Sequence, residues 1–182
     1  MKNFTFNSLN KSATDGIACA IEKLNEKSLT PVIICVGSDM VLGDSLGPLC
    51  GTMLKTRGVD CYVYGTLNFP VTAKEIAHVK TLVNKIHPNA ITIAIDAAVG
   101  IQEEVGIIKV ASDGLFPGLG VNKKLCKLGD LSIIGVVASK SLQNYNLYNL
   151  TRLNLIYKMA ETIADGIQKY IKTLSNLEQM AL

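Results

Sequence analysis

The sequence predicts an α/β fold, with a doubly wound, mostly parallel sheet in a three-layer arrangement and helices on both faces. Two short apolar runs, 32–36 and 90–96, have the length and β-branched composition of strands that are covered on both sides. Segments with helical periodicity lie between the strands, and this alternation is typical of parallel sheets. The chain has 182 residues, 48% of them hydrophobic, so we expect residues 1–182 to form one domain.

The elements follow in order along the chain. Apolar residues at helical spacing predict the first and last helices, and short apolar or β-rich runs predict the strands. Thr72 and Glu75 have the spacing of a capping box, which predicts the start of a helix that Pro88 ends. The expected helices span 13–26, 46–55, 72–86 and 149–174, and the expected strands span 32–36, 60–64, 90–96, 106–110 and 132–137.

Composition excludes several classes of function. The net charge is +3 and the basic residues are scattered, whereas a nucleic-acid-binding protein needs a clustered basic face. The five cysteines form no C-x-x-C pair, which favours free thiols in a reducing compartment. The sequence has neither a signal peptide nor 18 consecutive apolar residues. We therefore expect a cytoplasmic protein with no nucleic-acid or membrane partner. The sequence does not decide whether the protein forms an oligomer.

The stretch GSDMVLGDSLGP, residues 37–48, places two acids and three glycines directly after the first predicted strand. In an open parallel sheet, ligands bind beyond the carboxyl ends of the strands, where the strand order reverses. The most common order for such a fold puts this reversal between strands 32–36 and 90–96. Asp44 and Asp96 should then face each other across one crevice, and Gly37, Ser38 and Asp39 should line it.

Two facing carboxylates in a partly dry cleft cannot both ionise at low cost. One of them keeps its proton, so the pair can supply a general acid and a general base for hydrolysis. A divalent metal between the two carboxylates is the other chemical option. Asp44 could also be a simple helix N-cap, because it directly precedes a predicted helix. Asp39 taken alone is typical of a solvated turn.

A second glycine-rich stretch lies at 116–124. It lacks the spacing of a Walker A loop. Its backbone N–H groups and Lys123 could contact a substrate carbonyl or carboxylate, and the alternative is a surface turn with solvated lysines. The residues assigned to substrate binding here are Gly118, Gly120, Asn122 and Lys123. Neither His78 nor His87 lies near the predicted crevice, so Ser/His/Asp or Cys/His catalysis is not expected.

Three motifs in order, at 43–48 (GDSLGP), 95–97 (IDA) and 117–123 (PGLGVNK), resemble the spore germination protease superfamily. The stretch 117–132, with the motif GDLSI at 129–133 and the later GVV at 135–137, is particularly similar to the short YyaC-like sporulation proteins of spore-forming Firmicutes. This resemblance covers roughly residues 32–137. It implies a phosphorylase/hydrolase-like α/β fold that is shared with hydrogenase maturation proteases, and therefore a single germination-protease-like domain.

The resemblance also implies a function. It points to a sporulation-associated hydrolase, an aspartic-type peptidase acting on a peptide or protein that could be a spore protein, with Asp44 and Asp96 as the catalytic acids. An inactive, partner-binding member of the same fold is the alternative. A metal-binding maturation factor is a weaker one, because the maturation proteases add a later histidine to two acids and none follows His87 here. We expect no cofactor and no bound metal.

Overall fold

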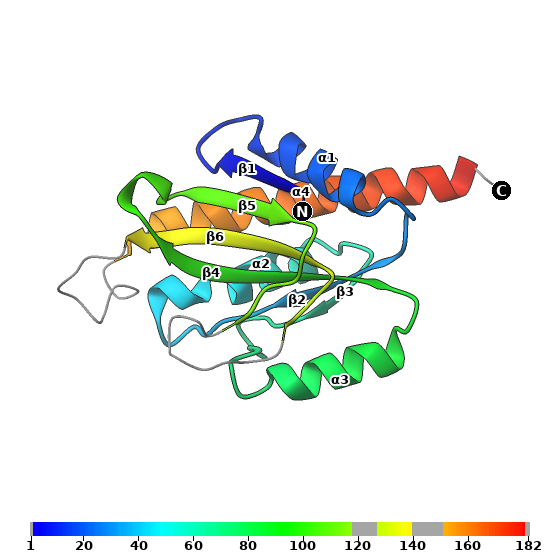
Figure 1. The fold of residues 1–182 in the computed structure, drawn as a ribbon, viewed down its shortest axis with the longest axis horizontal. Helices are drawn as coiled ribbons and strands as arrows, with labels where there is room; N and C mark the ends of the chain where they lie inside the picture. The colour runs from blue at the N-terminus through cyan, green and yellow to red at the C-terminus, as the bar shows by residue number, and fades with distance from the viewer. Residues whose placement is uncertain (1, 118–126, 140–150, 181–182) are drawn as a thin grey trace.

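The structure is a computed structural model, and it describes residues 2–117, 127–139 and 151–180. Its centre is a six-stranded sheet in the order β1-β5-β6-β4-β2-β3 (Figure 1). The strands β3, β2, β4 and β6 run parallel to one another. At one edge of the sheet, β5 is antiparallel to β6, and β1 is antiparallel to β5. The strands are β1 (Asn3–Asn7), β2 (Pro31–Cys35), β3 (Tyr62–Tyr64), β4 (Ile91–Gly100), β5 (Ile107–Ala111) and β6 (Leu131–Ser139).

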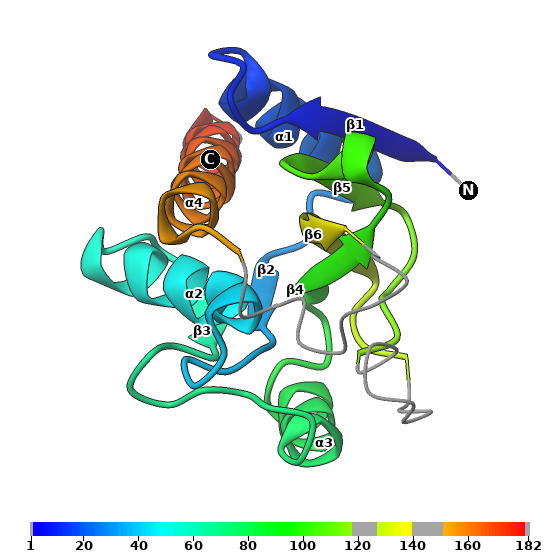
Figure 2. The same cartoon turned by 90° about the vertical axis from the view of Figure 1, so that its left-hand side faces the viewer.

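Helices cover both faces of this sheet, as Figure 2 shows. The helices α1, α2 and α4 lie on one face, and α3 lies on the other. Their bounds are α1 (Ala13–Leu24), α2 (Leu46–Thr56), α3 (Ile76–Ile86) and α4 (Leu153–Met180), and two short 3-10 helices are η1 (Leu42–Ser45) and η2 (Gln102–Glu104). The three-layer, mostly parallel α/β fold that the sequence predicts is confirmed.

Each face of the sheet has its own apolar core. Residues of one parity in β2 and β4, such as Ile33 and Ile95, pack against α1, α2 and α4. Residues of the other parity, such as Ile34 and Ala94, pack against α3. Because both parities are buried, these strands are continuous apolar runs in the sequence.

Several boundaries differ from the sequence-based expectations. The helix α3 begins at Ile76 rather than Thr72, although the Glu75 carboxylate does accept the Thr72 N–H at 3.0 Å, as a capping box requires. The last helix begins at Leu153 and continues to Met180. The strand β1 was not predicted, and its Phe4 and Phe6 pack against the α1-side core.

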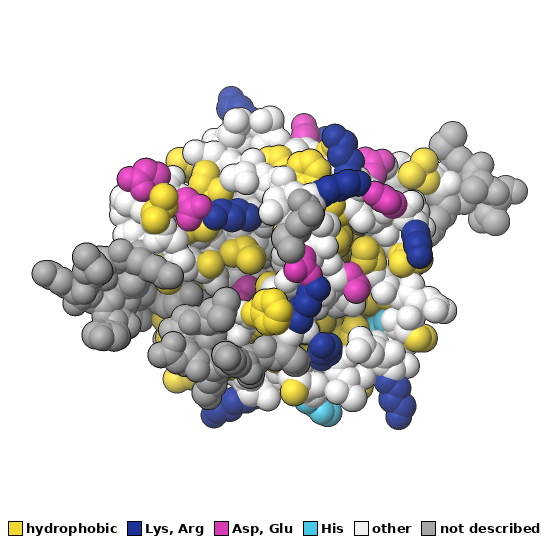
Figure 3. Space-filling view, in the orientation of Figure 1, with side chains coloured by type: hydrophobic (Ala, Val, Ile, Leu, Met, Phe, Trp, Pro, Cys, Tyr) yellow, Lys and Arg dark blue, Asp and Glu magenta, His cyan; other side chains and the backbone are white. Residues whose placement is uncertain are grey.

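The surface carries charges of both signs. Figure 3 shows acidic and basic side chains interspersed over the face that it displays. Within the described part of the chain, none of the helices combines the length and the apolar character that crossing a membrane requires.

Candidate active site

The loop that carries Asp44 leaves the sheet directly beside Asp96. The strands β2 and β4 are parallel neighbours, with Cys35 paired to Ile95. One residue later, the Val36 N–H donates to the Ile95 carbonyl oxygen at 2.7 Å. Since β3 lies on the other side of β2, the strand order reverses between β2 and β4, as the sequence predicts. The loop therefore begins at the topological switch point.

Gly37 allows this loop to fold back onto Asp44. Its φ is +139°, a conformation that side-chain-bearing residues rarely adopt. A Cβ at this position would lie only 2.0 Å from the Asp44 carbonyl oxygen. The turn is held by the Gly37 N–H, which donates to the Val71 carbonyl oxygen at 3.0 Å, and by the Ser38 N–H, which donates to the Asp44 carbonyl oxygen at 3.1 Å. Backbone geometry thus fixes where Asp44 sits.

Asp44 lies in η1, just before α2, and its side chain is partly buried. The N-cap position of α2 belongs to Ser45, whose hydroxyl donates to the Leu42 carbonyl oxygen at 2.6 Å. Asp44 is therefore not the N-cap of α2, which was one of the two roles that the sequence suggested for it.

Asp96 lies within β4, which runs on past it to Gly100. Its neighbours Ile95 and Ala97 belong to the core on the α1 side, so strand alternation turns Asp96 to the opposite face, as it does Ala94. The Asp96 Oδ1 accepts the N–H of Ala97 at 2.8 Å, and the side chain is partly buried.

The charge of Asp44 affects the ionisation of Asp96. Burial and, next, the charge of Asp44 raise the pKa of Asp96 to about 8, and the Ala97 N–H only partly opposes this rise. Burial also raises the pKa of Asp44, and the backbone N–H of Ser38 opposes that rise. The contact between η1 and β4 brings the two segments that carry these acids together. Burial therefore favours the protonated form of both carboxyls, and most strongly that of Asp96.

The other predicted site residues fall into two groups. Gly37 is buried, Ser38 is partly buried and Asp39 is exposed, as expected of a solvated turn. Ser38 also uses its Oγ to accept the Met40 N–H at 3.2 Å. The residues Gly118, Gly120, Asn122 and Lys123 lie outside the described residues.

The described flanks of the second glycine-rich stretch border the same face of the sheet as Asp96. Leu115 and Leu128 form an antiparallel bridge, with N–H···O distances of 3.0 and 2.8 Å. Both leucines are buried in the α3-side core together with Ala94.

The residues in place do not form a metal centre of three or more ligands. Asp44 and Asp96 supply two carboxylates, and within the described residues no group of three or more His, Cys, Asp or Glu side chains is arranged to hold an ion. His87 lies elsewhere, with its Nε2 3.0 Å from the Tyr64 hydroxyl.

The sequence did not predict a cavity of about 560 Å³ beside β3. The residues that line it come from α2, from β3 and the loop after it, and from the start of α3. Neither Asp44 nor Asp96 lines this cavity. The features of the sequence that could have indicated this cavity were Gly65, which directly follows an expected strand, and the loop after it.

Comparison with known proteins places the chain in a family. Residues 5–166 match the family model DUF1256, described as "Protein of unknown function". The chain belongs to this family. As a DUF1256 member it is also 40% identical over 137 residues to "Uncharacterized protein YyaC" of Bacillus subtilis (strain 168), a match that covers 75% of this chain and 67% of that protein. The expected similarity to YyaC is thereby confirmed.

The fold of this DUF1256 member is similar to a solved structure. The [NiFe] hydrogenase maturation protease HycI from Thermococcus kodakarensis KOD1 superposes with a TM-score of 0.56. The match covers 84% of this chain and 98% of HycI at 18% sequence identity. This similarity confirms the hydrogenase-maturation-protease-like fold expected from the sequence.

Proposed function

We propose that this protein is a hydrolase, an aspartic-type peptidase that uses Asp44 and Asp96 to activate water. The observation that carries the proposal is the position of Asp44 and Asp96 at the switch point of the sheet, where burial raises the pKa of both carboxyls and that of Asp96 to about 8. A pair of acids whose pKa values are pushed apart supplies an acid and a base at the same pH.

The unequal pKa values assign a role to each carboxyl. Ionised Asp44 accepts a proton from the attacking water while the water oxygen bonds to the peptide carbonyl carbon. Protonated Asp96 donates its proton to the carbonyl oxygen as this carbon becomes tetrahedral. The C–N bond then breaks as the leaving nitrogen takes the proton from Asp44 and one hydroxyl of the tetrahedral carbon returns a proton to Asp96. The products are a carboxylic acid and an amine, and the pair is back in its starting state.

The cellular setting of the proposal comes from the motif resemblance to the spore germination proteases. We place the protein in the cytoplasm of sporulating cells and take its substrate to be a peptide or protein, with spore proteins as candidates. The alternative is a non-enzymatic member of the family that binds a partner through the same fold.

The proposal is tested by incubating the purified protein with an extract of sporulating Bacillus cells and identifying new peptide termini by mass spectrometry. We expect the wild type to generate new termini and the Asp44→Asn/Asp96→Asn double variant to generate none. Asp15→Asn is the matched control, because Asp15 is exposed on α1 and pairs there with Lys169. Equal cleavage by the double variant would refute the mechanism, and no cleavage by any form would favour the partner-binding alternative.

A further inference from the structure

We propose that the cavity beside β3 is the substrate-binding groove, and that it takes an extended segment of polypeptide as an added strand on the free edge of β3. The inference deepens the proposed peptidase function and rests on it. The cavity has a volume of about 560 Å³, which is ample for several residues of an extended chain.

The edge of the sheet is open at this cavity. The strand β3 is the last in the sheet order, and β2 is its sheet neighbour. In a three-residue strand with a neighbour on one side, alternate N–H and C=O groups point outward. A row of such groups is the feature to which extended peptides add.

The loop after β3 begins against β2 rather than against the outer edge of β3. Gly65, at φ +91°, lies so close to β2 that a Cβ there would be 1.9 Å from the Cys35 carbonyl oxygen. The chain then leaves the sheet and returns at Val71, which pairs with Val36. The intervening loop is anchored to α2, because the Leu67 N–H donates to Thr52 Oγ1 at 2.9 Å.

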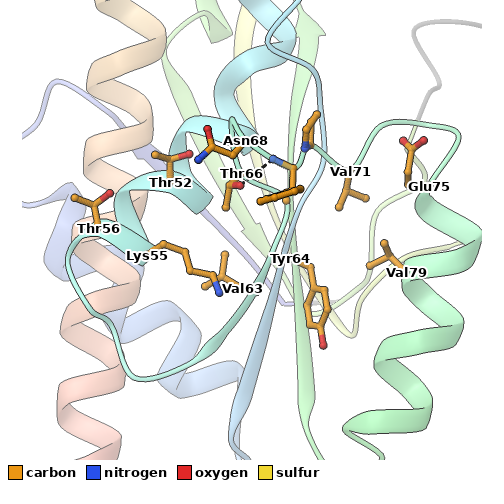
Figure 4. A pocket seen from close by; sticks show the side chains of 13 residues that line it. Thr52, Lys55, Thr56, Val63, Tyr64, Thr66, Asn68, Val71, Glu75 and Val79 are labelled. Carbon is orange, nitrogen blue, oxygen red and sulfur yellow. Dashed lines mark hydrogen bonds between the residues drawn. The ribbon is translucent and has the colours of Figure 1, made fainter.

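The two walls of the cavity differ in charge. Figure 4 shows Lys55 and Val63 on the side of α2, and Tyr64, Val79 and Glu75 toward α3. Both charged side chains are exposed. In the described part of the chain, neither one forms a salt bridge.

The different charges of the two walls predict which peptide sequences bind in the cavity. Successive side chains of an added strand point to opposite faces of the sheet. One set would meet the α2 wall with Lys55, and the other would meet the α3 wall with Glu75. Charge complementarity therefore favours a peptide with an acidic residue on one face and a basic residue on the other.

The cavity is also connected to the acid pair. Val71 lines the cavity, and its carbonyl oxygen accepts the N–H of Gly37 at 3.0 Å. Gly37 in turn packs on the backbone of Asp44. One wall of the groove is thus hydrogen-bonded to the loop that carries Asp44, so the groove adjoins the end of the sheet where hydrolysis is proposed.

The test measures binding by fluorescence anisotropy with a labelled probe, Thr-Glu-Val-Thr-Lys-Val-Thr, whose Glu and Lys face opposite sides of a strand. Its isomer Thr-Glu-Val-Lys-Thr-Val-Thr places both charges on one side. We expect the probe to bind about threefold more tightly than the isomer, as befits exposed charge pairs. We expect Lys55→Glu to weaken probe binding about tenfold, because attraction becomes repulsion.

Rescue and control variants complete the design. Replacing Glu by Lys in the probe should restore its binding to Lys55→Glu. Glu75→Gln should weaken probe binding about threefold while keeping the bond to Thr72, because Gln also serves in a capping box. Lys11→Glu makes the same charge change at an exposed site away from the cavity lining and should leave binding unchanged. Thermal melting by circular dichroism confirms that each variant is folded.

The outcomes separate this inference from the peptidase proposal. The Asp44→Asn/Asp96→Asn variant should bind the probe normally, so binding without any cleavage would refute only the peptidase. The groove proposal would be overturned if the protein cleaved peptides but bound the probe and its isomer equally well. It would also be overturned if Lys55→Glu and Glu75→Gln left probe binding unchanged. Failure of both peptides to bind would overturn it too. A dimer in sedimentation that Lys55→Glu dissociates would show that a second copy occupies this edge, and would also overturn it.

Discussion

Raising the pH from about 4 to about 8 is expected to lower the free energy of unfolding, and Asp96→Asn is expected to remove most of this loss. The pKa of Asp96 is about 8 in the folded protein, against 3.8 for the same group in an unfolded chain. Between these values the folded state holds a proton that the unfolded state releases, so stability falls as the pH rises. A shift of this size corresponds to a loss on the order of several kcal/mol by pH 8.5.

The measurement is urea unfolding followed by circular dichroism at pH 5 and pH 8.5. Asn keeps the shape of Asp and the acceptor for the Ala97 N–H, but it carries no charge to be desolvated. The variant should be about as stable as the wild type at pH 5 and clearly more stable at pH 8.5. The Asp15→Asn control should follow the wild type. Parallel pH dependence in the wild type and Asp96→Asn would contradict this account of the buried acid.

The rate of peptide cleavage is expected to have a bell-shaped dependence on pH. The rate should rise as Asp44 ionises, at a pH above its ordinary pKa of 3.8, because burial raises that pKa. It should fall near pH 8 as Asp96 loses the proton that it donates. Each single variant, Asp44→Asn or Asp96→Asn, should reduce cleavage by at least ~100-fold, the lower range for removal of an acid or base.

This profile is measured on a substrate identified by the peptide-terminus experiment, with kcat/KM determined between pH 4 and pH 10. Far-UV circular dichroism at each pH excludes unfolding as the cause of either limb, and Asp15→Asn again serves as the control. A rate that stays constant through pH 8, or an Asp96→Asn variant that retains the alkaline limb, would show that Asp96 is not the acid.

The position of the Asp44 loop beside the strand of Asp96 could be predicted from the sequence because it follows from the topology of the sheet. The runs around Ile33 and Ile93 are recognisable as strands since both of their faces are buried. Once these two strands are parallel neighbours with the reversal between them, the loop that carries Asp44 must begin beside β4, the strand that carries Asp96. Local patterns and one rule of topology were sufficient for this step.

The remaining features depend on contacts between distant parts of the chain. The strand β1 pairs with β5, so that Asn3 lies opposite Ala111. No local pattern in the sequence around β1 predicts this antiparallel pairing. The cavity beside β3 is lined in part by the loop that leaves the sheet after Gly65 and returns at Val71, which pairs with Val36. Likewise, the unequal ionisation of the two acids depends on burial, which the spacing of residues does not specify.

The central claim, that Asp44 and Asp96 form one coupled pair, is tested most directly by a 13C NMR titration of the aspartate carboxyl carbons. In the wild type, the Asp96 resonance should titrate with an apparent pKa of about 8. In Asp44→Asn that pKa should be lower, because the neighbouring negative charge is gone. An Asp96 resonance that titrates near 3.8, or one that Asp44→Asn leaves unshifted, would contradict the account.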